Sequence, residues 1–412
     1  MPIHELTVLF FLQLAFILAV TRLVGLLLRR LQQPQVVGEM VGGVLVGPSL
    51  LGACWPAGHA ALFPAESTPL IYALSQLGLV LYMFLVGAEF DLGLLRRHLR
   101  SAAAVAGAGI AVPFSLGAGA AYYLARDTGL FSPRVEVWEA MLFTGAAMAI
   151  TAFPMLARII QERGLTGTTL GTLVLAAGGV NDAAAWCILA VVLASFAGDV
   201  AIALRAVVGG AVYAAACWWI LRPLLRRWAE KAGDEGRLDG NTWVVLLVLL
   251  LAGAWFTDYV RIYAVFGAFI LGMAMPRGRL TRELQRGCGP LTTYLLVPLF
   301  FVYSGLHTRL DQLVSPERWG LLLVLVALAC AGKGVACWLA ARLHGEAHRD
   351  ALAVGVLMNA RGMMELLLLN IGLEQGLITP TFFTLMVAMT IVTTLMATPL
   401  FELIYRHAPR PA

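Results

Sequence analysis

The sequence predicts an all-α polytopic membrane protein with about thirteen transmembrane helices. Of its 412 residues, 60% are apolar and 13% are charged, which is about half the charged share of an ordinary soluble domain. Apolar stretches of about 20 residues, long enough to cross a bilayer, recur along the whole chain. The longest polar interval, residues 222–241, is too short to hold a soluble catalytic or nucleotide-binding domain.

The expected spans follow one another with short polar connections. The first lacks the basic n-region and small-residue cleavage site of a signal peptide, so we expect it to be retained. The second is less uniformly apolar, because it contains Glu39 among several glycines. The expected spans are residues 6–28, 34–53, 68–88, 101–125, 137–160, 168–196, 201–221, 241–257, 259–276, 290–306, 319–341, 350–374 and 381–404.

The distribution of basic residues predicts the orientation of these spans. With the N-terminus outside, the inward-facing loops carry about 20 of the 29 lysines and arginines, and the outward-facing loops carry about six. The opposite topology inverts this bias. We therefore expect an outside N-terminus, a cytoplasmic C-terminus and an odd number of spans. The net charge of +5 follows this sidedness and does not indicate nucleic-acid binding.

Two expected spans are interrupted. In residues 137–160, Pro154 removes a backbone donor, and it favours extended geometry at Phe153. In residues 350–374, the apolar pattern is broken by Asn359, Arg361, Gly362 and Glu365. These are the fifth and twelfth spans. Interruptions at matching positions predict two inverted six-helix repeats joined by a linker helix, an arrangement typical of secondary transporters.

A buried charge lies in a span next to each interrupted one. Asp182 follows Asn181 in the middle of residues 168–196. Lys333, one of the two lysines in the chain, lies in the middle of residues 319–341. A charged group at bilayer depth costs about 2.5–3.5 kcal/mol on insertion scales, so an acid and a base in such places indicate an ion or proton pathway.

Six segments carry a resemblance to a known family. In chain order they read QQPQVVGEMVGGVLVGPSLLG, LVGAEFDLGLLRR, TAFPMLARII, AAGGVNDAAAW, AGKG and NARGMMEL. Together they resemble the monovalent cation:proton antiporter superfamily, in its second branch of sodium/proton and Kef-type potassium/proton antiporters. The resemblance implies that the two broken helices cross each other. It also implies a homodimer in a lipid bilayer, in which a mobile core carries the ion by an elevator-type movement.

The same resemblance implies a division of the chain. Residues 1–100 and 241–306 are expected to form a dimerisation or scaffold domain, and residues 101–200 and 319–407 the ion-binding core. Residues 201–240 are expected to form the linker helix and a cytoplasmic loop. Because the chain ends at Ala412, we expect no attached regulatory domain.

The family's ion-binding carboxylate corresponds to Asp182, which is expected to bind a proton and Na⁺ or K⁺ alternately. Its opposing lysine corresponds to Lys333. Electrogenic relatives carry two adjacent aspartates, and Asn181 replaces the first, which the family pattern associates with electroneutral 1:1 exchange. If Lys333 also releases a proton, the exchange becomes electrogenic, with two protons per cation. The alternative for Asp182 is a structural acid in an ion pair.

The neighbouring residues leave alternatives open. Thr151 and the backbone near Ala152 can supply oxygen ligands, because unwound helices expose carbonyls, or Thr151 can satisfy its own backbone. Asn181 can be a ligand or a cap for a freed carbonyl. Lys333 can be a fixed countercharge, a proton carrier or a tie between the crossing helices.

Four further residues are predicted to be structural or to control access. Pro154 is expected to cause the first break. Arg361 and Glu365 are four residues apart and are expected to pair on one helix face. Glu39 lies in a glycine-rich run that favours tight helix packing, with a role as an acid that admits ions as the alternative.

The function implied by the resemblance is antiport of Na⁺ or K⁺ against H⁺ across the inner membrane of a bacterium. We find no spacing for a metal cluster and no nucleophile with a base, so we expect neither a cofactor nor an enzyme. The main alternative is a sodium-coupled symporter of an organic solute on a related inverted-repeat fold. An ion channel and a membrane-embedded sensor are weaker alternatives. Na⁺ and K⁺ are not distinguished, and pH homeostasis, salt resistance and osmotic adjustment are all compatible roles.

Overall fold

A computed structural model describes residues 2–31, 33–89, 99–126, 129–165, 168–196, 200–231, 239–260, 263–276, 278–313 and 315–405. These residues fold almost entirely into helices, and their β pairing is limited to an isolated antiparallel bridge between Phe131 and Ile378. Nine of the described helices are long and apolar enough to cross a membrane. The all-α prediction is confirmed. Each of the expected spans coincides with one helix or with two or three consecutive helical segments, while the number of membrane crossings stays a prediction.

The chain divides into two compact units. The first comprises Met1–Leu18, Phe63–Asp91 and Leu193–Tyr303. Its helices are the first part of α1 (Ile3–Arg29), η1 (Ala65–Ser67), α5 (Thr68–Glu89), the end of α10 (Thr169–Phe196), α11 (Val200–Ala216), a π-helical turn (Cys217–Leu221), α12 (Arg222–Lys231), α13 (Gly240–Tyr259), α14 (Ala264–Ala274), α15 (Arg279–Leu291), a second π-helical turn (Thr292–Leu296) and most of α16 (Val297–Leu306). The expected polar interval 222–241 therefore begins with a helix.

Glycines set the close packing inside this unit. A Cβ atom added to Gly87 of α5 lies 2.3 Å from the Phe269 carbonyl oxygen of α14, and one added to Gly272 of α14 lies 2.2 Å from the Phe84 carbonyl oxygen. Neither distance is compatible with a side chain, so α5 and α14 approach each other backbone to backbone.

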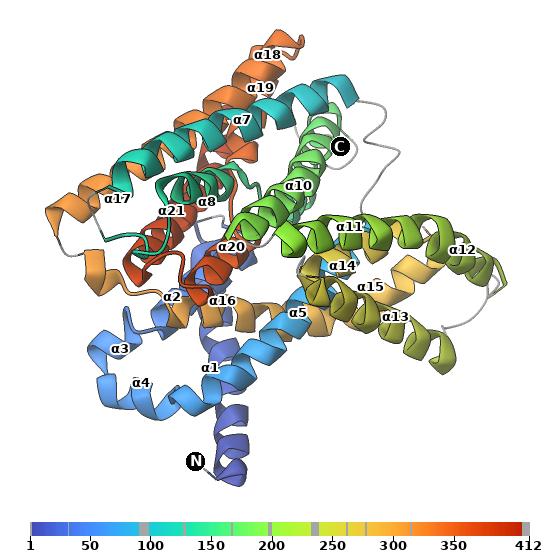
Figure 1. Cartoon of the computed structure of the whole chain (residues 1–412), viewed down its shortest axis with the longest axis horizontal. Helices are drawn as coiled ribbons and strands as arrows, with labels where there is room; N and C mark the ends of the chain where they lie inside the picture. The colour runs from blue at the N-terminus through green and yellow to red at the C-terminus, as the bar shows by residue number, and fades with distance from the viewer. Residues whose placement is uncertain are drawn as a thin grey trace. The chain divides into compact units, whose positions relative to one another are not determined.

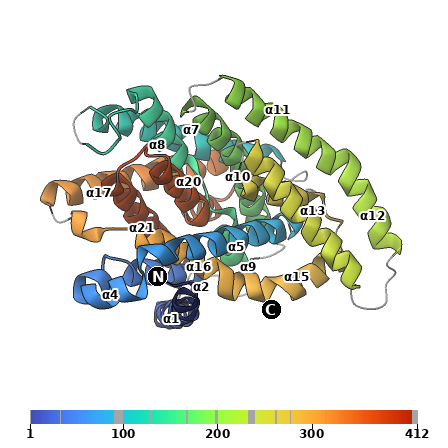
Figure 2. The ribbon, with the colours of Figure 1, turned by 60° about the horizontal axis from the view of Figure 1, so that its bottom comes forward.

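The second unit comprises Ala19–Leu62, Leu92–Val192 and Ser304–Ala412. Its helices are the end of α1, α2 (Gln35–Val46), α3 (Leu51–Cys54), α4 (Pro56–Leu62), α7 (Leu99–Leu124), α8 (Val137–Ala149), α9 (Phe153–Glu162), most of α10, the end of α16, η4 (Leu310–Leu313), α17 (Pro316–Ala329), a π-helical turn (Cys330–Val335), α18 (Ala336–Leu343), α19 (His348–Met358), α20 (Met363–Glu374) and α21 (Pro380–Tyr405). Helix α7 packs along α8 and α18 (Figure 1). Helix α21 contacts α17, α19 and α20, and Figure 2 shows α20 and α21 side by side in dark red.

The two compact units divide the chain differently from the expected scaffold and core, and a division by contacts does not test those roles. Residues Ala19–Leu62, expected in the scaffold, belong to the same unit as the expected core. The roles of the segments in dimerisation and movement stay a prediction. All described residues of the two interrupted spans lie in the second unit, so the candidate site is built within that unit.

The first interruption separates α8 from α9. Residues Ile150, Thr151 and Ala152 are not helical, and Ile150 is extended with φ −66° and ψ 135°. Pro154 is the second residue of α9 and has no N–H to donate to the Ile150 carbonyl, so a continuous helix is broken here. The expectation for Phe153 is wrong: it begins α9, and the extended geometry lies before it.

The second interruption separates α19 from α20. Residues 359–362 lie between Met358, which ends α19, and Met363, which begins α20. Asparagine and glycine are poor helix formers, and this short segment contains Asn359 and Gly362. Both predicted interruptions are therefore confirmed.

Candidate functional site

The two interruptions meet and are joined by hydrogen bonds. The Ala152 N–H of the first donates to the Ala360 carbonyl of the second, with an N···O distance of 3.3 Å. Next to this contact, the Thr151 N–H donates to Oδ1 of Asn181 on α10, at 3.1 Å. The broken helices thus cross, and the residue beside Asp182 is bonded to the crossing.

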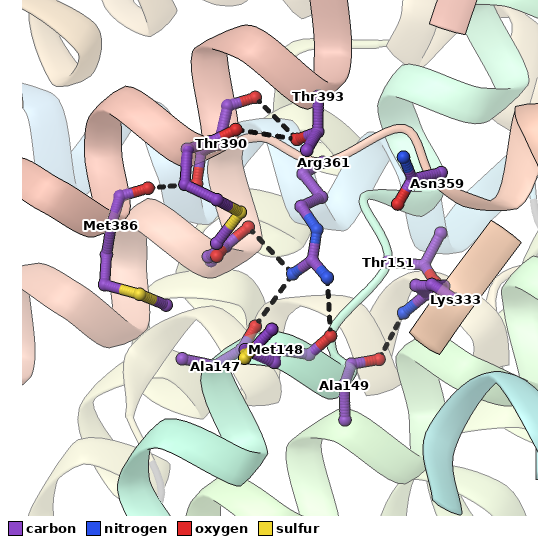
Figure 3. Close-up of polar contacts among 12 residues, drawn as sticks. Ala147, Met148, Ala149, Thr151, Lys333, Asn359, Arg361, Met386, Thr390 and Thr393 are labelled. Atoms are coloured by element: carbon purple, nitrogen blue, oxygen red, sulfur yellow. Dashed lines mark hydrogen bonds and ion pairs between the residues drawn. The ribbon is translucent and has the colours of Figure 1, made fainter. Parts of the chain in front are cut away.

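The C-terminal end of α8 is bonded completely at this crossing. An α-helix leaves its last four carbonyls without partners inside the helix. Of these, the Ala146 carbonyl accepts the Ile150 N–H at 3.2 Å. Arg361 donates from Nη1 to the Ala147 carbonyl at 3.2 Å and from Nη2 to the Met148 carbonyl at 2.8 Å. Lys333 donates from Nζ to the Ala149 carbonyl (Figure 3).

Electrostatics explains why two cations gather here. Aligned peptide dipoles place about half a negative charge at the C-terminus of a helix, and a cation there is stabilising. Arg361 and Lys333 are fully buried, with 0% exposure. Buried backbone carbonyls also require donors, and the long arginine and lysine side chains supply them.

Glu365 balances one of the two cations. Its Oε2 lies 3.3 Å from Nη1 of Arg361, and both side chains are fully buried. Glu365 lies in the first turn of α20, where the helix dipole favours an acid. The predicted pair is present, but its predicted geometry is wrong. Arg361 precedes α20, so the two residues do not share a helix face.

Lys333 lies in the π-helical turn Cys330–Val335, between α17 and α18. Such π segments inside helices are frequently found at functional sites. Its described partner is the Ala149 carbonyl, across the crossing. Of the three roles considered for Lys333, this contact corresponds to the tie between the crossing helices.

Asn181 acts as a cap, but not for the expected group. Its Oδ1 accepts the freed N–H of Thr151 instead of its Nδ2 donating to a freed carbonyl. The backbone oxygens expected as ligands are partly engaged: the Thr151 carbonyl accepts the Phe153 N–H at 3.1 Å, and the Ala152 carbonyl accepts the Leu156 N–H at 2.9 Å. Each retains a second lone pair.

Two predicted residues lie outside what the structure describes at the level of side chains. Asp182 belongs to α10 and Pro154 to α9, and only the helical backbone is described for both.

Glu39 is buried in α2, within the run of glycines. A Cβ atom added to Gly38 lies 2.3 Å from Cα of Gly25 on α1, and one added to Gly47, just after α2, lies 2.2 Å from the Gly305 carbonyl oxygen. Both contacts are shorter than a side chain allows. The glycines of this run therefore support tight packing, as predicted for the segment, and the role of Glu39 itself stays a prediction.

Two contributors were not predicted. The Thr394 hydroxyl on α21 donates to the Arg361 carbonyl at 2.8 Å and accepts the Arg361 N–H at 3.2 Å. Asn359, predicted only to interrupt the helix, donates from Nδ2 to Sγ of Cys330 at 3.3 Å. The sequence holds little signal for Thr394, because a mid-helix threonine usually bonds a carbonyl of its own helix.

Besides Nε of Arg361 and Oε1 of Glu365, three buried polar atoms of uncharged side chains at the crossing have no hydrogen-bond partner among the described residues. They are Oγ1 of Thr151, Nδ2 of Asn181 and Oδ1 of Asn359. Buried polar groups are normally bonded, so a cluster of three marks a place where a ligand or water is expected.

Comparison with known proteins decides the family. The family profile described as sodium/hydrogen exchanger, transmembrane, matches residues 15–405. The chain belongs to this family. The resemblance seen in the six segments is confirmed, and the chain is a multi-pass membrane protein of a transporter family, as predicted, rather than an enzyme.

This exchanger-family chain is similar to known proteins both in sequence and in fold, as two relatives and one solved structure show. It is 38% identical to the Na(+)/H(+) antiporter NhaS4 of Synechocystis sp. over 399 residues, covering 96% of each chain. It is 36% identical to the Cation/H(+) antiporter 18 of Arabidopsis thaliana, covering 99% of this chain and 50% of that one, so it spans about half the length of this relative. Its fold is similar to that of the sodium proton antiporter MjNhaP1 from Methanocaldococcus jannaschii, with a TM-score of 0.68 at 16% identity, covering 97% of this chain and 99% of that one.

Proposed function

We propose that this chain exchanges a monovalent cation, Na⁺ or K⁺, for H⁺ across a membrane, and that Asp182 binds the two ions in turn. A carboxylate holds one proton or one partly dehydrated cation, so competition at this group couples the two flows. Family membership and the names of the relatives support the exchange.

The observation that carries the role of Asp182 is the charge at the crossing. Among the described residues there, two buried cations, Arg361 and Lys333, accompany one buried anion, Glu365. An unbalanced buried charge is unfavourable, so a second anion is expected nearby. Asp182 is adjacent to Asn181, whose side chain is bonded to the crossing. We assign that anion to Asp182, with Thr151 as a neutral oxygen ligand beside it.

The contacts also favour a fixed charge on Lys333. Its Nζ donates to the Ala149 carbonyl, and a protonated amine is stabilised at the C-terminus of α8. Asn181 does not titrate. With one titrating acid, the exchange is 1:1 and electroneutral.

Five further features complete the proposal. The protein acts as a homodimer in a bacterial inner membrane, with its N-terminus outside and its C-terminus in the cytoplasm. Residues 1–100 and 241–306 form the scaffold, and the crossing moves with the core in an elevator-type cycle. The excess of arginines on the proposed cytoplasmic loops supports this orientation.

The test is antiport in proteoliposomes, read with a pH-sensitive dye after addition of Na⁺, K⁺ or Li⁺. Wild type is compared with Asp182→Asn, and with Asp258→Asn as a matched control at an exposed acid of α13. We expect cation-evoked proton flux in wild type and in the control, and none in Asp182→Asn. The Na⁺ and Li⁺ assays are repeated with K⁺ and valinomycin to clamp the voltage, which leaves the rate of an electroneutral exchange unchanged.

Flux that persists in Asp182→Asn overturns the role of this carboxylate. A wild type that shows no flux with any of the three cations overturns the antiport itself. In that case, Na⁺-driven uptake of organic solutes in the same vesicles tests the symporter alternative.

A further inference from the structure

We propose that Asn359 is a further ligand of the transported cation, through its side-chain oxygen Oδ1, and that it contributes to selection among monovalent cations. This inference rests on the proposed antiport. Asn359 is 7% exposed and occupies the C-cap position of α19, at the start of the second interruption. Its Oδ1 is buried and has no hydrogen-bond partner among the described residues.

The other end of the amide has a described partner. Nδ2 of Asn359 donates to Sγ of Cys330 at 3.3 Å, at the first residue of the π-helical turn that carries Lys333. In Figure 3 the amide nitrogen lies on the far side and the oxygen on the side of Thr151. Asn359 therefore presents an acceptor toward the crossing, not a donor.

The position of Asn359 brings it beside the other unpartnered oxygen. The Ala152 N–H donates to the Ala360 carbonyl, and Thr151 and Asn359 each precede one partner of this hydrogen bond. The Thr151 hydroxyl is fully buried and also lacks a partner in the described part of the chain. Each broken helix thus contributes one oxygen that has no partner among the described residues, next to the hydrogen bond that joins them.

Oxygen acceptors of this kind suit a cation. Carbonyl and hydroxyl oxygens replace the water shell of a partly dehydrated alkali ion. The expected occupant is a monovalent cation held by the Asp182 carboxylate, with the two neutral oxygens completing its shell. Because these oxygens belong to different broken helices, the spacing of the two segments sets the size of ion that fits.

A structural role is the competing explanation. Asparagine is a common cap of helix ends, and a bound water can satisfy its oxygen. The backbone of α19 does not need the side chain, however. The Val356 carbonyl accepts the Asn359 N–H at 3.2 Å, and the Leu357 carbonyl accepts the Ala360 N–H at 3.1 Å. The Asn359 oxygen is left for another partner.

The test substitutes Asn359→Leu, which keeps a similar volume and removes the oxygen, and Asn359→Ser, which keeps a shorter oxygen. The matched control is Asn370→Leu, at a buried asparagine of α20 that donates to its own helix at the Leu366 carbonyl, 2.8 Å away. Two quantities are measured for Na⁺, K⁺ and Li⁺: the half-saturating concentration for antiport at fixed pH, and the rise in melting temperature of the purified protein with added cation.

We expect Asn359→Leu to raise the half-saturating concentration about tenfold, as for the loss of one contact to a charged group, and to change the ratio among the three cations. The maximal rate changes little, and the melting-temperature rise with cation weakens in parallel. Asn359→Ser gives a smaller shift, and Asn370→Leu gives none.

Three results overturn the inference while leaving the antiport proposal intact. The first is an Asn359→Leu variant with unchanged half-saturation and cation ratios. The second is a variant that loses only maximal rate. The third is wild-type cation affinity and selectivity in Asn359→Ser, which is the result that decides if Asn359→Leu does not fold. A wild type without cation-evoked flux is the separate failure of the proposed function.

Discussion

The two broken helices end in different ways, although they occupy matching positions in the two predicted repeats. The first half-helix of one, α8, ends against two buried cations, and all four of its last carbonyls have described partners. The first half-helix of the other, α19, ends in ordinary backbone turns, in which its last turn bonds the N–H groups of Asn359 and Ala360. The predicted symmetry of the two repeats is therefore not accompanied by a symmetry of charge.

The difference between the ends of α8 and α19 shows that buried positive charge is needed at the end of α8. Both cations reach α8 from the half of the chain that contains α19: Arg361 from the second break and Lys333 from the turn before α18. The negative end of the α8 dipole and these cations attract each other across the crossing. The cations thus hold the first break to the second, and Arg361 serves both, by its side chain and by its backbone.

The largest expected effect comes from removing Arg361. Arg361→Met leaves the Ala147 and Met148 carbonyls without donors and Glu365 without its described cation. Breaking a buried ion pair by removing one partner costs about 3–5 kcal/mol, so we expect a large fall in melting temperature and no antiport. The measurement is the apparent melting temperature of the purified protein.

A double variant separates the two jobs of this arginine. In Arg361→Met with Glu365→Leu, no charge of the pair remains unpaired, so the part of the loss due to the ion pair is restored. We expect the double variant to stay below wild type, because the α8 carbonyls still lack donors. Full recovery in the double variant contradicts the capping role of Arg361.

The second break tests the other side of the comparison. Among the described residues, the hydrogen bonds between this break and α21 come from the Thr394 hydroxyl, which bonds both the N–H and the carbonyl of Arg361. Thr394→Val removes both bonds at nearly constant volume and is expected to cost about 1–3 kcal/mol through unsatisfied buried backbone groups. The fall in melting temperature should be smaller than for Arg361→Met.

The neighbouring threonine provides the control for this variant. The Thr393 hydroxyl bonds the Met389 and Thr390 carbonyls of its own helix, so Thr393→Val removes no contact to the break. Thr394→Ser keeps the hydroxyl and should behave as wild type. Equal losses in Thr393→Val and Thr394→Val show that the hydroxyl of Thr394 does not position Arg361.

The features that could be predicted from the sequence are those that depend on residue types within one segment. A proline within an apolar span, a lysine among apolar residues and the polar segment at Asn359 each contradict a continuous lipid-facing helix, so they are visible without coordinates. Contacts between residues that are far apart in the chain could not be predicted in this way. The reach of Arg361 to α8, and of Lys333 to Ala149, depends on how the helices cross. Asn181 was predicted to cap a carbonyl, whereas it accepts the Thr151 N–H. The sequence does not tell which freed backbone group lies next to its side chain.

Replacing Lys333 is expected to change stability least, and it is also the change that distinguishes the two possible stoichiometries. Lys333→Met leaves the Ala149 carbonyl without its described donor, but it also removes a buried ammonium whose desolvation opposes folding. These contributions oppose each other, so we expect a net loss of about 1 kcal/mol or less in unfolding free energy. The same side chain distinguishes the stoichiometries, because a proton carrier cannot be replaced by methionine without changing the charge moved per cycle.

Voltage-clamped antiport decides between these roles. If Lys333 only ties the crossing helices, Lys333→Met slows exchange, and clamping the voltage leaves the rates of wild type and variant unchanged. If Lys333 carries a proton, wild-type exchange responds to the clamp and the variant does not, since a single titrating acid then remains. Lys333→Gln refines the comparison, because its amide can still donate to the Ala149 carbonyl without a charge. Recovery of the rate in Lys333→Gln relative to Lys333→Met assigns the contribution of Lys333 to the hydrogen bond that closes the end of α8.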